Sequence, residues 1–409
     1  MRILFVTQIV PYPPHGGVLQ RGFNLLRELG RHHEVHLLAF HHLDELPMGE
    51  PYEASRRELG KFCASVEYFP LWVKRSKFHK VLGLLGAGLY PKPYSVLAHK
   101  SPALTRRVRE LCLGSKRPDI VHLDTIGLAP LATECGDVPV VLAHHNVESQ
   151  LMARRGEVQS GGLAKAYIRM QAERLVRYER EQCERFALNI MVSRLDAEVL
   201  SRACPGIRTV VIPNGVDTEY FAPRPGSETP AVIYTGGMQM FANRDAVDWF
   251  LEAIWPKLKA AVPGIKFLAV GQRPSAKVLA ASALDPDIEA PGFVPDVRTW
   301  VARAAVYVVP LRVGGGTRLK MVDAMAQGKA IVATTVGAEG IEGDNGRHFL
   351  LEDSPDAFAA ATIRLLNDAT ARNQLGQAAR ARAEEVYAWP LLGAQLAGYY
   401  EQVIAEARR

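Results

Sequence analysis

The chain has 409 residues, of which 48% are hydrophobic and 22% charged, and its formal net charge is +6. The length exceeds one ordinary hydrophobic core, so we expect two domains of roughly 200 residues each, and the composition excludes a disordered or fibrous protein. Residues 1–215 carry 29 Lys and Arg against 21 Asp and Glu. This half could face an anionic partner or an anionic membrane, or it could simply present a solvated basic surface.

The cysteines indicate a reducing compartment. They are odd in number, form no CxxC pair and are spread along the chain, which argues against a zinc site or a disulfide framework. The five are Cys63, Cys112, Cys135, Cys183 and Cys204. The apolar run at residues 2–6 is too short for a membrane span, and no segment approaches 18 uninterrupted apolar residues. We therefore expect a cytoplasmic protein, with peripheral contact at the inner face of the plasma membrane left open.

The first half alternates short apolar runs with amphipathic stretches. A helix is predicted over residues 19–31, after a Gly-rich turn, and a long charged helix over about 160–186. The predicted strands cover residues 2–7, 34–40, 65–71, 119–124, 139–145, 188–193 and 209–215. This alternation predicts a parallel sheet covered by helices on both faces.

The pattern restarts after a segment rich in turn formers. A helix is predicted over residues 244–258, with two final helices over about 374–386 and 391–407. The predicted strands cover residues 231–237, 266–271, 288–294, 304–311 and 329–334.

The predicted fold class is α/β, with two doubly wound, Rossmann-like domains facing each other across a cleft. The first domain would span residues 1–214, the linker 215–230 and the second domain 231–409, with the last helix able to pack back on the first domain. Ligands of such sheets bind at the carboxyl ends of the strands.

One segment of the second half, "VPLRVGGGTRLKMVDAMAQGKAIVAT" at residues 309–334, carries the features of an anion site. A predicted strand leads into Gly314, Gly315 and Gly316, which let a ligand approach the backbone, and Thr317 is a suitable N-cap. The N-terminus of a helix favours anions, and Arg318 and Lys320 would add fixed cations where a helix dipole disfavours them. Asp323, further along, could accept hydrogen bonds from hydroxyls. Phosphate and vicinal hydroxyls together indicate a nucleotide.

The same segment resembles the donor-binding signature of family 4 glycosyltransferases, which have the two-domain GT-B fold. Other segments resemble that family in the same order along the chain: "VTQIVPYPPHGGVLQR", "PVVLAHHNVES", "VVIPNGVDTEYFAP", "YTGGMQMFANRDAVDWF" and "APGFVPDV". Together they cover nearly the whole chain. The variants "GGGTRLK" and "HNVES" are closest to a subgroup associated with extracellular polysaccharide production.

The resemblance assigns roles to individual residues. His145 would hydrogen-bond the donor sugar near the reacting carbon, Arg318 and Lys320 would hold the diphosphate, and these three form the expected catalytic set. The expected donor-binding set is Gly16, Gly17, Gly236, Gly237, Asn243, Gly292, Phe293, Val294, Gly314, Gly315, Gly316, Thr317 and Asp323. Asp323 would contact the ribose. Gly315 stands where relatives often carry a carboxylate that orients the donor sugar.

Some neighbouring residues have alternative interpretations. Strand alternation would point His144 and His145 to opposite faces, so that His144 would pack or support its neighbour. Asp124 could bind acceptor hydroxyls or cap a helix, and Glu148 could cap the following helix instead of reacting. Residues 74–94, basic and apolar, could lie on a membrane and admit a lipid-linked acceptor, or could form a buried helix with a basic flank.

The resemblance implies a retaining glycosyltransferase that moves a sugar from a nucleotide diphosphate donor to a hydroxyl acceptor, such as a lipid-linked glycan, in the synthesis of exopolysaccharide or another cell-envelope glycan. It implies no metal and no other cofactor, and no feature indicates nucleic-acid binding. A nucleotide-sugar 2-epimerase and a catalytically silent nucleotide-sugar-binding protein remain as alternatives.

Overall fold

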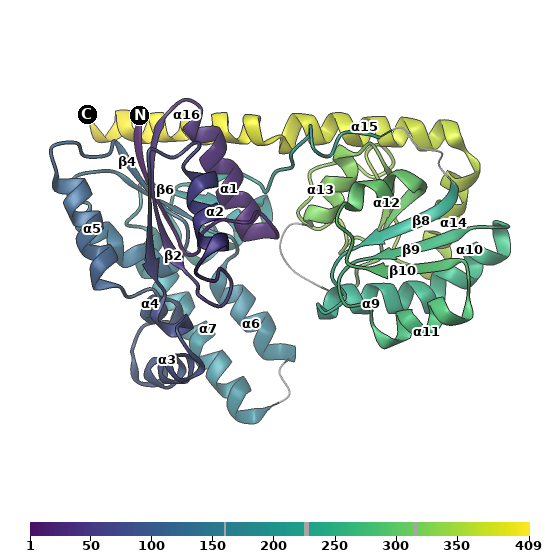
Figure 1. Ribbon diagram of the computed structural model, residues 1–409, viewed down its shortest axis with the longest axis horizontal. Helices are drawn as coiled ribbons and strands as arrows, with labels where there is room; N and C mark the ends of the chain where they lie inside the picture. The colour runs from purple at the N-terminus through teal and green to yellow at the C-terminus, as the bar shows by residue number, and fades with distance from the viewer. Residues whose placement is uncertain (159–160, 225–228, 314–317) are drawn as a thin grey trace. The chain divides into compact units, whose positions relative to one another are not determined.

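The computed structural model describes residues 1–158, 161–224, 229–313 and 318–409 (Figure 1). It divides the chain into two compact units. The N-terminal unit consists of Met1–Asn214 together with Leu392–Arg409, and the C-terminal unit is Gly215–Leu391. Nearly all of the last helix thus belongs to the N-terminal unit, and the described part of residues 215–230 belongs to the C-terminal unit.

The N-terminal unit is built on a seven-stranded parallel sheet in the order β3-β2-β1-β4-β5-β6-β7. The strands are β1 Arg2–Thr7, β2 Glu34–His41, β3 Ser65–Pro70, β4 Ile120–Leu123, β5 Val140–Ala143, β6 Leu188–Met191 and β7 Thr209–Val211. Its α-helices are α1 Gly17–Gly30, α2 Glu50–Leu59, α3 Lys77–Leu89, α4 Tyr94–Ala98, α5 Pro102–Leu113, α6 Glu148–Val158, α7 Gly162–Cys183 and α8 Arg194–Ala203. Two 3-10 helices cover Trp72–Lys74 and Ile126–Glu134.

The C-terminal unit has a six-stranded parallel sheet in the order β10-β9-β8-β11-β12-β13. The strands are β8 Thr229–Thr235, β9 Lys266–Val270, β10 Ile288–Gly292, β11 Ala304–Val309, β12 Ala330–Ala333 and β13 Leu350–Leu351. Its α-helices are α9 Phe241–Trp249, α10 Trp255–Ala261, α11 Ala276–Leu284, α12 Val297–Arg303, α13 Leu319–Ala326, α14 Pro355–Asn367 and α15 Ala369–Tyr387. The last helix, α16, is Trp389–Ala407.

Continuous apolar strands place a core under each sheet. In β1, Ile3 to Val6 are at most 1% exposed, and in β11 the run Ala304–Val309 is buried throughout. Strands buried on both faces need such runs, because helices cover both sides of a parallel sheet. The two strand orders confirm the predicted doubly wound α/β class.

Several element boundaries differ from the predictions. The helix predicted over residues 244–258 is divided by a π-helical turn at Phe250–Ile254, because Pro256 has no N–H to continue the ladder. Helix α13 begins at Leu319, and the flanking residue is Arg318. The predicted N-cap, Thr317, lies outside the described residues. Helix α6 was not predicted, and it precedes the long predicted helix.

No helix in the described part of the chain is both long and apolar enough to span a membrane.

Candidate functional site

The C-terminal sheet changes direction between β8 and β11. From β8 the chain continues to β9 on one side, and β11 returns to the other side of β8. In doubly wound sheets ligands bind beyond the carboxyl ends of the strands at such a point. The turn that follows β8 contains Gly236 and Gly237, and helix α13 follows β11. The predicted residues Gly236, Asn243, Arg318, Lys320 and Asp323 therefore lie around one switch point.

Lys320 reaches across this switch point. Its Nζ donates hydrogen bonds to the Tyr234 hydroxyl at 2.6 Å and to Asn243 Oδ1 at 2.8 Å. The ammonium also lies 4.2 Å from the centre of the Tyr234 ring, a cation–π contact. Asn243 is fixed in turn, because its Nδ2 donates to the Gly237 carbonyl at 2.8 Å. A lysine on α13 is thus held against the turn after β8.

The turn has room for this lysine only because Gly236 lacks a side chain. A Cβ at Gly236 would lie 2.6 Å from Lys320 Nζ, and the residue has a φ of 150°. Both the backbone conformation and the space therefore require glycine here. In this structure Gly236 and Asn243 position the Lys320 ammonium, and their predicted contact with the donor stays a prediction.

Burial makes the charged form of Lys320 less favourable. Desolvation, with repulsion from Arg318, lowers the pKa of the Lys320 ammonium to about 7. Its bonded acceptors are neutral, and within the described residues no carboxylate lies at ion-pair distance from Nζ. An anion bound here would supply the missing counter-charge.

Arg318 is anchored beside this group. Only 8% of its surface is exposed, and its Nη2 lies 3.4 Å from Glu339 Oε2, while its Nε donates to the Val336 carbonyl at 3.3 Å. From the sequence, Arg318 is expected to bind phosphate directly. The ion pair with Glu339 shows that the guanidinium already has a carboxylate, so an entering anion would share it.

Asp323 is the buried acid of the site. Its Oδ1 is inaccessible and has no hydrogen-bond partner among the described residues, and desolvation raises the pKa of the carboxyl group to about 7. A buried acceptor without a donor is costly to a folded protein. A ligand hydroxyl would satisfy it, in agreement with the ribose contact predicted from the sequence.

The remaining donor-site predictions lie at the same edge of the sheet or outside the described residues. Gly292 ends β10 with a φ of 75°, Phe293 follows it with 68% of its surface exposed, and Val294 is partly buried. An exposed aromatic ring at the carboxyl edge can stack on a base. Gly314, Gly315, Gly316 and Thr317 lie outside the described residues.

The N-terminal sheet has its own switch point, between β1 and β4. Asp124 follows β4, and His145 follows β5, which ends at Ala143. His145 Nε2 lies 3.1 Å from Asp124 Oδ1, although the two atoms do not have hydrogen-bond geometry. Asp124 therefore faces His145 and does not act as the helix cap suggested by the sequence. Glu148, in the first turn of α6, has its pKa raised by burial, against the opposing charge of His145.

His144 has a structural role. The strand ends before both histidines, so strand alternation cannot decide their directions as expected. His144 is buried, its Nε2 lies 3.1 Å from Asn189 Oδ1, and burial lowers its pKa to about 4. The neutral ring helps to hold β5 against β6.

The expected Gly-rich loop at α1 is explained by its backbone. Gly16 precedes α1 with a φ of 92°, which only glycine adopts readily, and a Cβ there would meet no atom within 4 Å. Gly17 is the first residue of α1. The open space would admit a ligand, but the backbone alone requires glycine at position 16.

The sequence did not reveal a buried polar cluster beneath β1 and β4. Arg21 is 1% exposed and donates to the Ile212 and Pro213 carbonyls at 2.8 and 3.0 Å. His122 stacks on Phe5, and its Nδ1 lies 2.6 Å from the Tyr400 hydroxyl. Tyr400 belongs to the last helix, 278 residues away from His122, and no local pattern could link them.

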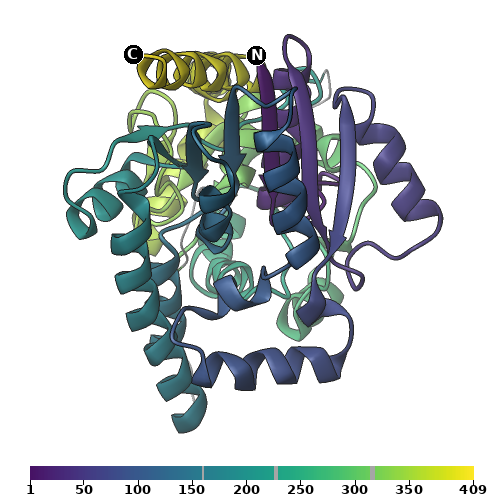
Figure 2. The same ribbon diagram turned by 90° about the vertical axis from the view of Figure 1, so that its left-hand side faces the viewer.

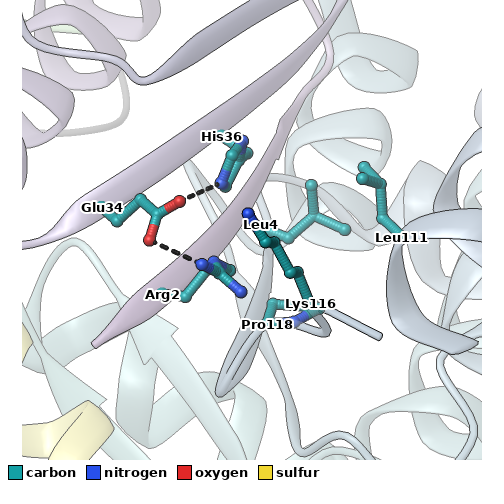
Figure 3. Close-up of a pocket in the computed structure, with 7 residues that line it drawn as sticks. All are labelled: Arg2, Leu4, Glu34, His36, Leu111, Lys116 and Pro118. Atoms are coloured by element: carbon teal, nitrogen blue, oxygen red, sulfur yellow. Dashed lines mark hydrogen bonds and ion pairs between the residues drawn. The ribbon is translucent and has the colours of Figure 1, made fainter. Parts of the chain in front are cut away.

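A pocket lies at the opposite edge of the N-terminal sheet, away from Asp124 and His145 (Figure 3). It has a volume of about 190 Å³ at the amino ends of β1 and β2. Glu34 in its wall pairs with Arg2 at 2.9 Å and with His36 at 3.1 Å (Figure 3). Glu34 is therefore paired within the pocket, which Lys116 also lines, and the pocket lies on the side of the sheet where parallel folds do not place their ligands.

Comparisons with known proteins agree with this architecture. Residues 15–220 match the family described as Glycosyltransferase Family 4, and residues 229–368 match that described as Glycosyl transferases group 1. The phosphatidyl-myo-inositol mannosyltransferase of Mycolicibacterium smegmatis is 28% identical over 337 residues, which is 78% of this chain and 80% of that protein.

Solved structures show the same fold at low identity. Anabaena HepE in complex with UDP superposes with a TM-score of 0.66 at 16% identity, covering 98% of this chain and all of that one. Sucrose-phosphate synthase from Thermosynechococcus elongatus gives a TM-score of 0.65 at 19% identity, covering 99% and 100%. The fold and the site therefore define a glycosyltransferase with two Rossmann-like domains, the GT-B fold. The chain belongs to glycosyltransferase family 4.

Proposed function

We propose that this glycosyltransferase transfers a sugar, with retention of configuration, from a nucleotide diphosphate donor to a hydroxyl acceptor. The observation that supports this most is Lys320, held over the turn after β8 with a pKa of about 7 and only neutral hydrogen-bond acceptors. A diphosphate is the ligand that this environment lacks. Its negative charge grows as the sugar leaves, and fixed cations stabilise that change most effectively.

Three further residues complete the proposed donor site. Arg318 shares the diphosphate charge, Asp323 accepts hydrogen bonds from the ribose hydroxyls, and Phe293 stacks on the base. Support for the ribose role is the unpartnered, buried Oδ1 of Asp323. His145, oriented by Asp124, donates a hydrogen bond to the donor sugar in this proposal.

The proposed reaction needs no paired carboxylates. The bond between the anomeric carbon and the phosphate oxygen breaks, and the acceptor oxygen attacks the same face of the sugar. The acceptor proton passes to the departing phosphate oxygen, so the nucleotide diphosphate itself acts as the base. Because Lys320 and Arg318 supply the positive charge, we expect transfer to continue in the presence of EDTA.

The proposed acceptor is a lipid-linked or other cell-envelope glycan, and the proposed location is the cytoplasmic side of the membrane. Support comes from the likeness to a phosphatidyl-myo-inositol mannosyltransferase and from the resemblance of the variants GGGTRLK and HNVES to a subgroup associated with extracellular polysaccharide. The base and the sugar are open. Thermal stabilisation by a panel of UDP and GDP sugars identifies them, since a ligand that binds the folded state raises the melting temperature.

The decisive variant is Lys320→Ala. With the donor so identified, we expect kcat to fall by about 10²–10³, as when one preorganised donor to a developing anion is removed. The matched control is Lys257→Ala, which removes an exposed lysine that pairs with Asp356 in the same unit. The product should keep the donor's anomeric configuration, measured by NMR. Normal turnover in Lys320→Ala, or an inverted product, would refute the proposal.

A further inference from the structure

Helix α3 has the reverse of the usual arrangement of residues. A helix on the surface of a globular protein turns its large apolar side chains inward. In α3 the buried positions are Gly83 and Ala87. The large apolar residues point outward, with exposed fractions of 71% for Phe78, 54% for Val81, 48% for Leu82, 68% for Leu85 and 92% for Leu89.

These five side chains form one stripe, here called the α3 apolar face. Val81 comes three residues after Phe78, Leu85 four after Val81, and Leu89 four after Leu85. This spacing repeats the helical period, so the five side chains lie on one side of α3. Single exposed apolar residues are ordinary, but a contiguous apolar stripe marks an interaction site. Figures 1 and 2 show α3 at the rim of the N-terminal unit, away from its two termini.

The outward orientation is fixed by polar contacts on the other side of α3. Helix α7 supplies them: Arg174 Nη1 donates to the Ala87 and Tyr90 carbonyls, and Gln171 Nε2 donates to the Ala87 carbonyl at 3.4 Å. Gly83 lets α3 approach closely, because a Cβ there would lie 2.8 Å from Val73. The helix cannot roll its leucines inward without breaking these contacts.

The charge around the α3 apolar face has a single sign. Residues 68–109 contain nine Lys and Arg but no Asp or Glu. Lys74 bonds Asp44 and Glu45. Arg75, Lys77 and Lys80 are exposed, and no acidic group in the described part of the chain lies within ion-pair distance of them. Apolar side chains bordered by unpaired cations are complementary to an anionic lipid surface, and a second copy of this basic face would be repelled.

We propose that the α3 apolar face docks on an anionic membrane, with α3 lying in the plane of the surface. Phe78, Leu82 and Leu85 enter the boundary between headgroups and acyl chains, while Arg75 and Lys77, next to Phe78 at the start of α3, lie against the headgroups. From the sequence, residues 74–94 are either a membrane-binding segment or a buried helix, and the exposure of the α3 apolar face contradicts the buried helix. Only the reason for docking, which is access to a lipid-linked acceptor, rests on the proposed function. Binding to vesicles does not depend on catalysis.

The test uses the full chain and vesicles without donor. Vesicles of phosphatidylcholine with 30% phosphatidylglycerol, against phosphatidylcholine alone, are sedimented with the protein at two salt concentrations (roughly 50 and 300 mM), because salt screens headgroup attraction. We expect preference for the anionic vesicles, weaker at high salt. The double variant Phe78→Ser with Leu85→Ser should bind at least about tenfold more weakly, and Arg75→Glu with Lys77→Glu should lose the preference for anionic lipid.

The matched control is Leu279→Ser with Leu284→Ser, which removes two exposed leucines of α11 in the other unit. It should bind like the native protein. All variants replace exposed side chains, so their melting temperatures should stay within about 2 °C of the native value. No vesicle binding, equal loss in the control, or self-association that disappears in the Phe78 variant would overturn the proposal. Transfer to a soluble acceptor, measured in parallel, reports separately on the proposed function.

Discussion

At the scale of single residues, the proposed donor site combines two groups, Lys320 and Asp323, whose charged forms are disfavoured by desolvation. Burial lowers the pKa of Lys320 to about 7 and raises that of Asp323 to about 7. Within the described residues, Lys320 has no carboxylate at ion-pair distance and Asp323 Oδ1 has no hydrogen-bond donor. Strongly shifted pKa values of this kind are concentrated at binding and catalytic sites. The sequence singled out both residues as site candidates, but their pKa shifts come from desolvation in the folded chain.

The free-energy cost of desolvating the Asp323 carboxylate can be measured through the pH dependence of the free energy of unfolding. The pKa of the carboxyl is about 7 in the folded chain against 3.8 in its absence. Between these values the folded state keeps a proton that the unfolded state releases, so stability falls as the pH rises from 4 to 7 and stays low above 7. We expect Asp323→Asn to be more stable at pH 8, by about 4 kcal/mol at most, and similar to the native protein at pH 4.

Thermal melts at pH 4 and pH 8 measure this difference. The same variant should bind the nucleotide diphosphate several-fold more weakly, because a charged acceptor of the ribose hydroxyls becomes neutral. A variant that is no more stable at pH 8 would mean that the carboxyl is not strained. Unchanged nucleotide affinity would remove Asp323 from the donor site.

At the scale of elements, the turn after β8 links sequence and chemistry. The pattern "YTGG" indicated a glycine turn, and the structure confirms a turn at the end of β8. What the pattern did not show is that Lys320, more than 80 residues later, occupies the space beside Gly236. The turn itself, with the sequence GGMQM at residues 236–240, contains no lysine. The structure places one there from α13.

Gly236→Ala tests this arrangement without changing a charge. The new Cβ would lie 2.6 Å from Lys320 Nζ, so the ammonium must move away from Tyr234 and Asn243. We expect nucleotide affinity, measured by calorimetry, to fall at least about tenfold. Gly264→Ala is the matched control: its φ is 71°, a strained conformation, but no atom lies within 4 Å of its Cβ. It should lose about 1 kcal/mol of stability and no affinity.

If both glycine variants bind the nucleotide equally well, the turn does not position Lys320.

Periodicity predicted most strands of both sheets, because a buried parallel strand must be a continuous apolar run. It failed where several signals overlap. Pro256 interrupted a helix that apolar spacing made continuous, and α6 was missed because its sequence "ESQLMARRGEV" has few apolar positions at helical spacing. In α3 the apolar spacing was visible, but the side that it faces depends on Gln171 and Arg174 of a distant helix.

At the scale of the whole molecule, the chain returns to the N-terminal unit at its end. Leu392, Leu396 and Tyr400 of α16 are fully buried, and the Tyr400 hydroxyl bonds His122 of β4. The sequence allowed this return but could not establish it, because the contact joins residues 278 positions apart. The core of the N-terminal unit therefore includes residues of α16, which follow the whole C-terminal unit in the sequence.

Tyr400→Ala tests the consequence for the whole chain. Removing a fully buried aromatic side chain leaves a cavity and an unpaired His122 nitrogen, so the N-terminal unit should lose about 3–5 kcal/mol of stability. The proposed nucleotide site lies in the C-terminal unit, and its affinity should stay within about twofold of native at 20 °C. Differential scanning calorimetry should show an early transition that a bound nucleotide does not shift, followed by one that it does. A single transition that moves as a whole would show instead that the two units unfold together, and that α16 stabilises both.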